Sequence, residues 1–308
     1  MATMNLLEYL RSRTQVDIDT YDAEASKEIG PFQDATGNQF EIQAEIVKPN
    51  RSAVLKRALE LATTIHPQFA TITLEELAVE VVGIELALEV IQTVHGNVHV
   101  MVNPSYSYNT EAIVANAQRL HHICQIVDPD FDTSRLVTKV PATWEGMQAS
   151  RQLKRNGIKT LATTVFSMEQ AILAGEAGSQ QFYHQNSLPT RVKACVTLNL
   201  DELIMLAGID ALTIAPKVLK VLTSTERPKE EMESMFLFAK TAKVTEIVKY
   251  ASYIDCESQY RVHFAASEGG KAQFKTAQAI SLFCDAQTAA ELYITSQLED
   301  SSYIPINL

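Results

Sequence analysis

The stretch that decides the fold is Leu136-Val137-Thr138-Lys139-Val140-Pro141-Ala142-Thr143-Trp144-Glu145-Gly146. It begins as a short apolar strand, and Lys139 interrupts the apolar run near the end of that strand. Burying an ammonium group costs several kcal/mol unless a carboxylate pairs with it, so a lysine in this position either forms an ion pair or loses its proton. An unprotonated lysine is a nucleophile that condenses with carbonyl compounds to form a Schiff base. The stretch by itself leaves both roles open.

Strands alternate with helices on both sides of this stretch. Apolar runs predict strands at residues 16–19, 97–103, 136–140, 158–164, 192–197 and 211–214. The count reaches eight only if residues 179–184 and the short segment 33–36 are also accepted as strands. Helical periodicity is found between them, for example at 143–155 and 51–65. Such alternation predicts βαβ units and a parallel sheet. The length of 308 residues suits one (β/α)8 TIM barrel of about 250 residues with extra helices. We therefore expect a single domain over residues 1–308, with additional N-terminal (4–13) and C-terminal (229–297) helices.

The composition excludes several classes of protein. Hydrophobic residues make up 46% of the chain and charged residues 20%, which is usual for a soluble globular protein. The net charge of −11 argues against nucleic acid as a partner, because phosphate binding needs clustered Lys and Arg. No apolar run approaches the ~18 residues of a membrane span, and residues 1–20 lack the apolar core of a signal peptide. The cysteines form no Cys-x-x-Cys pair and are expected to be reduced. We predict a cytoplasmic protein that does not bind membranes.

Four blocks of sequence resemble the transaldolase family. The first runs from Lys139 through Gly146 and continues at Phe166-Ser167-Met168-Glu169-Gln170-Ala171. The others are Gln33-Asp34-Ala35-Thr36-Gly37-Asn38, Ser107-Tyr108-Asn109-Thr110-Glu111-Ala112, and Leu206-Ala207-Gly208-Ile209-Asp210 with Leu212-Thr213-Ile214-Ala215-Pro216. They occur in the family's order and span most of the chain. The resemblance implies a (β/α)8 barrel whose fourth strand carries the Schiff-base lysine, here Lys139.

The resemblance also implies roles for residues at other strand ends. Asp19 matches a carboxylate that transfers protons and holds a substrate hydroxyl, and Thr163 matches a threonine that positions the catalytic water. Asn38 matches an asparagine that binds substrate hydroxyls, and Thr36 also matches the family's block. Each has a structural alternative, because a strand-end aspartate, a turn asparagine and a β-branched strand residue are all common.

Three positions depart from the family near the lysine. Met101 stands where the family has a water-activating glutamate, Asn103 where it has an aspartate, and Leu161 where it has an asparagine. Methionine cannot transfer a proton, so the family's proton relay is interrupted. We expect all three residues to line the substrate site. His99 shares a strand face with Met101 one layer deeper, where a core histidine is expected.

The family's phosphate site is also altered. Leu198 and Val196 replace an arginine and a serine, and a segment that carries a second arginine is shortened to His184–Thr190. Losing both arginines removes bidentate phosphate recognition. Arg191 would be a substitute for the lost arginines, but nothing about its position in the sequence supports this role.

New polar residues occupy the expected end of the sixth strand. Tyr183 or His184 would be the replacement acid/base, and Gln185 a further substrate contact. The alternative is a surface turn of mixed polar residues.

The sequence therefore favours a Schiff-base (class I) enzyme that makes or breaks a carbon–carbon bond next to a carbonyl group. The expected partner is a small-molecule carbonyl compound, non-phosphorylated or otherwise altered, in a specialised pathway such as secondary metabolism. No metal or organic cofactor is expected, since the lysine supplies the activation and His121-His122 is poorly spaced for chelation. One alternative is an authentic transaldolase that moves a dihydroxyacetone unit between sugar phosphates. The other is a non-catalytic binding barrel. The sequence is compatible with a homodimer.

Overall fold

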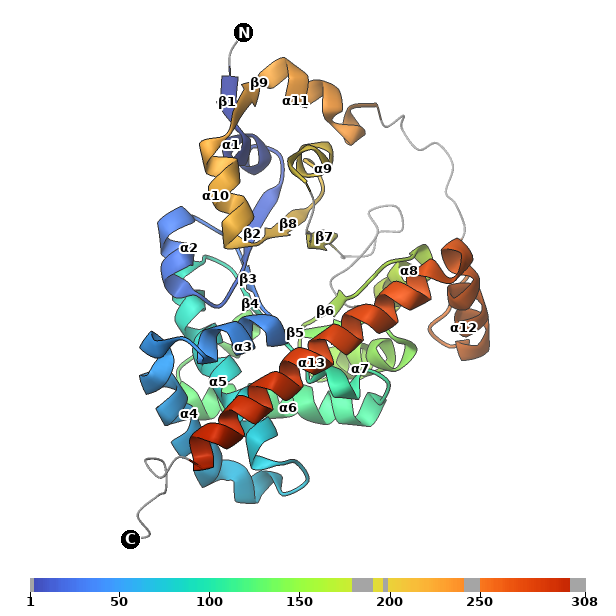
Figure 1. The fold of residues 1–308 in the computed structure, drawn as a ribbon. Coiled ribbons are helices and arrows are strands. Elements are labelled where there is room, and N and C mark those ends of the chain that lie inside the picture. The colour runs from blue at the N-terminus through green and yellow to red at the C-terminus, as the bar shows by residue number, and fades with distance from the viewer. Residues whose placement is uncertain (1–2, 179–190, 196–198, 241–249, 300–308) are drawn as a thin grey trace.

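A curled sheet of seven parallel strands forms the centre of the molecule (Figure 1). The computed structural model describes residues 3–178, 191–195, 199–240 and 250–299. The strands are β2 (Gln15–Asp19), β3 (Ala35–Thr36), β4 (Val98–Met101), β5 (Leu136–Pro141), β6 (Thr160–Thr163), β7 (Lys193–Cys195) and β8 (Ala211–Ile214). Their order is β6-β5-β4-β3-β2-β8-β7. The fold is thus α/β, as predicted, with a barrel-like sheet. The strand predicted at residues 179–184 lies outside the described residues.

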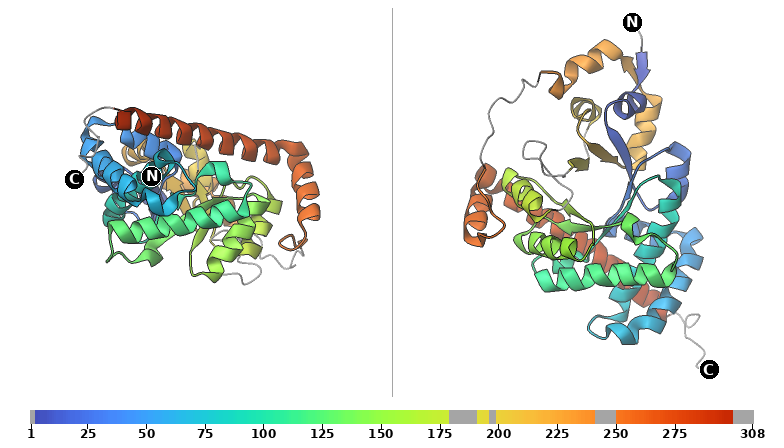
Figure 2. Two further views of the ribbon diagram at one scale, coloured as in Figure 1. Left: turned by 90° about the horizontal axis from the view of Figure 1, so that it is seen from below. Right: turned by 180° about the vertical axis from the view of Figure 1, so that it is seen from behind.

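Helices surround the sheet, as the two further views show (Figure 2). They are α1 (Leu6–Arg11), α2 (Ala23–Ile29), α3 (Gln39–Ile46), α4 (Ser52–Ile65), α5 (Leu74–Val90), α6 (Thr110–Val127), α7 (Trp144–Arg155), α8 (Met168–Ala177), α9 (Leu200–Met205), α10 (Pro216–Ser224), α11 (Lys229–Met235), α12 (Glu257–Ala266) and α13 (Lys271–Glu299). Helix α13 packs against α3 and α5 and crosses one end of the sheet (Figure 1). No helix among the described residues is long and apolar enough to cross a membrane.

The sequence predicted the described strands of the sheet to within a few residues but missed three helices. These are α2, α3 and α6, of which α6 begins after its N-cap Asn109, inside a block interpreted only for its resemblance. The helix predicted at residues 4–13 is shorter than expected. Its first residues instead form β1 (Thr3–Asn5), which pairs with β9 (Glu226–Pro228) in an antiparallel ribbon. Asn5 then caps α1 by accepting hydrogen bonds from the N–H groups of Leu7 and Glu8.

Capping residues mark where the helices α3, α5, α8 and α9 begin. Thr73 and Ser167 accept N–H groups in the first turns of α5 and α8. Reciprocal capping boxes form at α3 between Asn38 and Glu41, and at α9 between Asn199 and Glu202. A capping box satisfies two backbone groups that a helix end leaves free, so it holds the entry to the helix rigidly.

A buried ion pair joins two of the helices that cover the sheet. Arg119 of α6 donates to both oxygens of Glu80 of α5 at 2.6 Å, and Asn116 donates to the same carboxylate at 2.6 Å. Both charged side chains are buried. Such a pair contributes little relative to apolar residues, but removing one partner leaves an uncompensated buried charge.

We expect Arg119→Ala to lower the free energy of unfolding by about 3–5 kcal/mol, because Glu80 would lose its counter-charge. Lys27→Ala, which removes an exposed pair with Glu24, should change it by less than about 1 kcal/mol. Urea unfolding of the two variants measures the difference. Equal, small effects would show that the buried pair is dispensable.

Candidate active site

The strand register places Lys139 between two apolar side chains. Met101 of β4 and Leu161 of β6 are the cross-strand neighbours of Lys139 on either side. Lys139 is only 4% exposed, and its Nζ donates to the carbonyl oxygen of Gly37 at 3.4 Å. In the part of the chain that the structure describes, no carboxylate lies within ion-pair distance of Nζ. The described residues therefore do not form the ion pair that was the alternative role for Lys139.

Lys139 faces a cavity of about 390 Å³ at the end of the sheet. Polar residues from the strand ends line one part of it: Thr36, Lys139, Thr163, Lys193, Cys195 and Thr213. Apolar residues line the rest, including Leu161, Phe166 and, from α13, Ala279 and Phe283. The cavity thus joins a nucleophile to a partly apolar wall, which is the usual character of a small-molecule site.

Asp19 lies beside the cavity and is held by two neighbours. Its Oδ1 accepts a hydrogen bond from the Thr36 hydroxyl, and its Oδ2 lies 3.6 Å from the Cys195 sulfur. Asp19 and Thr36 are direct partners in the β2–β3 pairing. The structure therefore brings three of the predicted site residues, Asp19, Thr36 and Lys139, to the same end of the sheet.

The two asparagines have structural roles. Asn38 caps α3, with its side chain accepting from Phe40 N at 2.8 Å. Asn103 follows β4 and accepts from Ser105 N at 3.0 Å, while its own N–H donates to Asn116. Neither is among the residues that line the cavity. The side-chain oxygens of both residues already accept hydrogen bonds from backbone N–H groups. The predicted contacts of these residues with a substrate stay predictions.

Thr163 lines the cavity at the end of β6, and the residue after it is strained. Thr164 has φ 58°, a value that a β-branched residue rarely adopts. Such backbone costs of order 1–3 kcal/mol and tends to occur at functional sites. Gln170 of α8 holds the turn, donating to the carbonyl oxygens of Thr164 at 3.0 Å and Ala142 at 2.9 Å. One side chain therefore joins the ends of β5 and β6.

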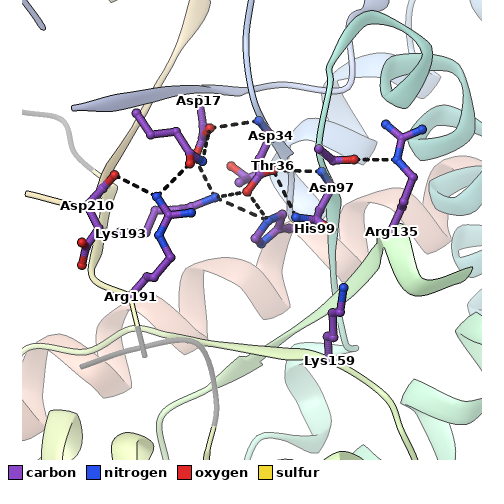
Figure 3. Close-up of polar contacts among 12 residues, drawn as sticks. Asp17, Asp34, Thr36, Asn97, His99, Arg135, Lys159, Arg191, Lys193 and Asp210 are labelled. Atoms are coloured by element: carbon purple, nitrogen blue, oxygen red, sulfur yellow. Dashed lines mark hydrogen bonds and ion pairs between the residues drawn. The ribbon is translucent and has the colours of Figure 1, made fainter. Parts of the chain in front are cut away.

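A layer of charged residues lies inside the sheet beneath the cavity (Figure 3). Lys193 Nζ lies 2.6 Å from Asp17 Oδ2 and 2.9 Å from Asp34 Oδ2. His99 Nε2 lies 3.2 Å from the same Asp34 oxygen. His99 is fully buried, which confirms the prediction of a core histidine. Burial, reinforced by the charge of Lys193, lowers the pKa of His99 to about 4. Although burial opposes it, the contacts with His99 and Lys193 hold the pKa of Asp34 below its usual range.

Arg191 lies at the opposite end of the strands from Lys139. Its guanidinium donates to Gln15 Oε1 at 2.9 Å and to the Asp210 carbonyl oxygen at 3.2 Å (Figure 3). Gln15 is the first residue of β2, whereas Asp19 at its other end lies beside the cavity. Arg191 therefore cannot bind a phosphate group of a molecule in the cavity.

The sequence matches one family model over more than half of its length. The model, described as Transaldolase/Fructose-6-phosphate aldolase, matches residues 16–182. The chain belongs to this family. Among its relatives is a transaldolase of Shewanella pealeana, 28% identical over 96% of this chain and 99% of that protein. A transaldolase of Synechocystis is 30% identical over 72% of this chain and 66% of that protein. One of Glaesserella parasuis is 28% identical over 73% and 81%.

Family membership makes the chain an aldolase- or transaldolase-type enzyme. Tyr183, His184 and Gln185 lie outside the described residues, as do Val196 and Leu198. Their predicted roles stay predictions.

Three residues near the lysine were not predicted from the sequence. Glu41 interacts electrostatically with both Asp19 and Lys139. Cys195 contacts Asp19, and Thr213 lines the cavity with a buried hydroxyl that has no hydrogen-bond partner among the described residues. The spacing of Asn38 and Glu41 is that of a capping box, a signal that was available in the sequence. Thr213 lies inside the fourth block of the resemblance, at residues 212–216, although no role was predicted for it, and nothing in the sequence alone marks Cys195.

The buried His99 predicts how stability depends on pH. Its folded-state pKa of about 4 lies below the ordinary value of 6.5, so between these values the unfolded chain binds a proton that the native chain does not. Stability should therefore fall as the pH is lowered from about 6.5 to 4, by roughly 1 kcal/mol per pH unit. His121, whose pKa burial also lowers, adds in the same direction.

Urea unfolding of the native protein and of His99→Asn across this range isolates the contribution of His99. The difference in unfolding free energy between the two proteins should shrink as the pH falls. A difference independent of pH would show that folding leaves the pKa of His99 unchanged.

Proposed function

We propose that the protein is a class I aldolase of the transaldolase family, with Lys139 as the Schiff-base residue. The observation that carries the proposal is the buried Lys139 amine, at a strand end in the family's position and facing a cavity. The amine adds to the carbonyl carbon of a ketone or aldehyde, and loss of water gives an iminium ion. The iminium withdraws electrons from the neighbouring carbon, so that a carbon–carbon bond beside it breaks or forms.

Asp19 and Thr163 would assist this chemistry. The Asp19 carboxylate, oriented by Thr36, would accept the proton from the substrate hydroxyl as the carbon–carbon bond breaks. Thr163 lines the cavity and would hold the water that enters or leaves. Tyr183, His184 and Gln185 would supply further contacts from the strand expected at 179–184. With that strand the sheet would close into a (β/α)8 barrel, forming one domain over residues 1–308. A cytoplasmic location and a homodimer remain part of the proposal.

The substrate that fits the described cavity has no phosphate group. No arginine is found among the residues known to line it, and Arg191 lies at the other end of the sheet. Lys193 reaches the cavity, but its charge is taken up by Asp17 and Asp34. Leu161, Phe166 and Phe283 favour an apolar group instead.

The second candidate function is that of an authentic transaldolase acting on sugar phosphates. The names of the relatives support it, since all three described above are called transaldolases. The two functions share Lys139 and differ in whether a cation meets the phosphate.

Borohydride reduction in the presence of dihydroxyacetone should trap a covalent adduct on Lys139, because the hydride reduces an iminium to a stable amine. Mass spectrometry of digested protein locates it. Lys139→Met should abolish the adduct, whereas Lys159→Met, which removes a lysine that donates to the Ser134 carbonyl oxygen, should not. An adduct on Lys193, or one that persists in Lys139→Met, would refute the assignment.

The phosphate group of fructose 6-phosphate should bring little benefit. We expect the kcat/KM for fructose 6-phosphate to exceed that for fructose by less than tenfold. A site with two arginines would gain about 1.5–3 kcal/mol from each charge-assisted hydrogen bond, which is a far larger factor. Steady-state kinetics with the two donors measures the ratio. A ratio of a thousand or more would favour the authentic transaldolase.

A further inference from the structure

One peptide unit links Lys139 to a carboxyl group that the family resemblance does not assign. The carbonyl oxygen of Gly37 accepts from Lys139 Nζ at 3.4 Å. The N–H of the same peptide, that of Asn38, donates to Glu41 Oε2 at 2.9 Å. The amine and the carboxyl group are thus bound to opposite ends of one rigid, planar group.

The first turn of α3 holds Glu41 in this position. The Asn38 side chain accepts from the helix while Glu41 reaches back to the Asn38 N–H, completing the capping box. On either side of Glu41, Phe40 packs edge-on against Phe283 of α13 with ring centroids 5.6 Å apart, and Ile42 lies against Gly83 of α5. The neighbouring helices therefore make apolar contacts here that anchor the turn.

The charged groups around Glu41 come from three strands. Burial, reinforced by Asp19 of β2, raises the pKa of Glu41 to about 7, against the effect of Lys139 of β5 and of the N–H groups that Glu41 accepts. Tyr21, which follows β2, and Cys195 of β7 also interact with its charge. A carboxyl group with a pKa near neutrality can hold a proton and release it when a cation forms nearby.

Among the residues that the structure describes near Lys139, the others are poorly suited to this task. Met101, beside Lys139 on β4, has a thioether that cannot carry a proton. Asp19 is engaged by Thr36 and Cys195, and Lys193 by Asp17 and Asp34. Schiff-base formation nevertheless requires an acid, because hydroxide is a poor leaving group.

We propose that Glu41 is the proton-transfer residue for formation and hydrolysis of the Schiff base at Lys139, an inference that rests on the proposed function. The Lys139 amine first adds to the carbonyl carbon to give a carbinolamine. The Glu41 carboxylic acid then gives its proton to the carbinolamine hydroxyl group. The carbon–oxygen bond breaks, water leaves, and the nitrogen lone pair forms the C=N bond, leaving an iminium cation and the Glu41 carboxylate. In hydrolysis the carboxylate takes a proton from the attacking water.

The experiment compares Glu41→Gln with a matched control. Glutamine keeps an oxygen that accepts the Asn38 N–H, so the cap is preserved while the transferable proton is lost. Glu202→Gln makes the same change at the other capping box, that of α9. The rate of adduct formation with dihydroxyacetone is followed by borohydride quenching at successive times from pH 5 to pH 9, and the adduct is located by mass spectrometry.

We expect Glu41→Gln to form the adduct on Lys139 roughly a hundredfold to ten-thousandfold more slowly, which is the usual contribution of general acid catalysis. The native rate should show an ionisation near pH 7 that the variant lacks, and Glu202→Gln should behave as the native protein. Glu41→Asp, which keeps a carboxyl group, should retain the ionisation at a reduced rate, and it provides the test if Glu41→Gln does not fold.

Two results would overturn the assignment of Glu41. One is a native rate and pH profile in Glu41→Gln, which would leave Glu41 as a helix cap alone. The other is a native protein whose rate shows no ionisation between pH 5 and pH 9. Absence of any adduct on Lys139 in the native protein would instead refute the proposed function, and the role of Glu41 with it.

Discussion

The parallel pairing of β4, β5 and β6 is the constraint on which the rest of the site depends. Side chains alternate between the two faces of a strand, so a shift of one residue would turn Lys139 from the inside of the curled sheet to the outside. The observed register sets Met101, Lys139 and Leu161 side by side. These apolar neighbours exclude water from the amine and supply no counter-charge to it.

The charged layer beneath the cavity differs from the surroundings of Lys139, because its charged side chains are paired with one another. Lys193, Asp17, Asp34 and His99 compensate one another at short distances, in a place where barrels usually carry branched apolar residues. Two lysines thus reach one cavity in different electrostatic settings. Lys193 is bound between carboxylates, which suits a structural cation. Lys139 meets a carbonyl oxygen and more distant carboxyl groups, which suits a nucleophile.

The turn between β3 and α3 connects these features to the chemistry. Gly37 is needed there because a Cβ would come within 2.2 Å of the Tyr21 ring, and the Tyr21 hydroxyl donates to the His99 carbonyl oxygen at 3.0 Å. The same turn contributes Thr36 to Asp19, the Gly37 oxygen to Lys139, and the cap of α3. The carboxyl group of Glu41 lies in the first turn of the helix that follows.

The sequence alone determined the family, the alternation of strands and helices, and the positions of Lys139, Asp19, Thr36 and Thr163. These follow from local patterns and from motifs that are contiguous in the chain. It also identified His99 as a core residue from its place one layer below Met101. It missed α2 and α3 because short helices give weak periodic signals, and α6 because that helix begins inside a block interpreted only for its resemblance. Only the tertiary structure decided which distant residues meet: Lys193 with Asp17 and Asp34, Arg191 away from the cavity, and Glu41 near the amine. Those contacts depend on the curl of the sheet and on where each helix begins, which local sequence does not specify.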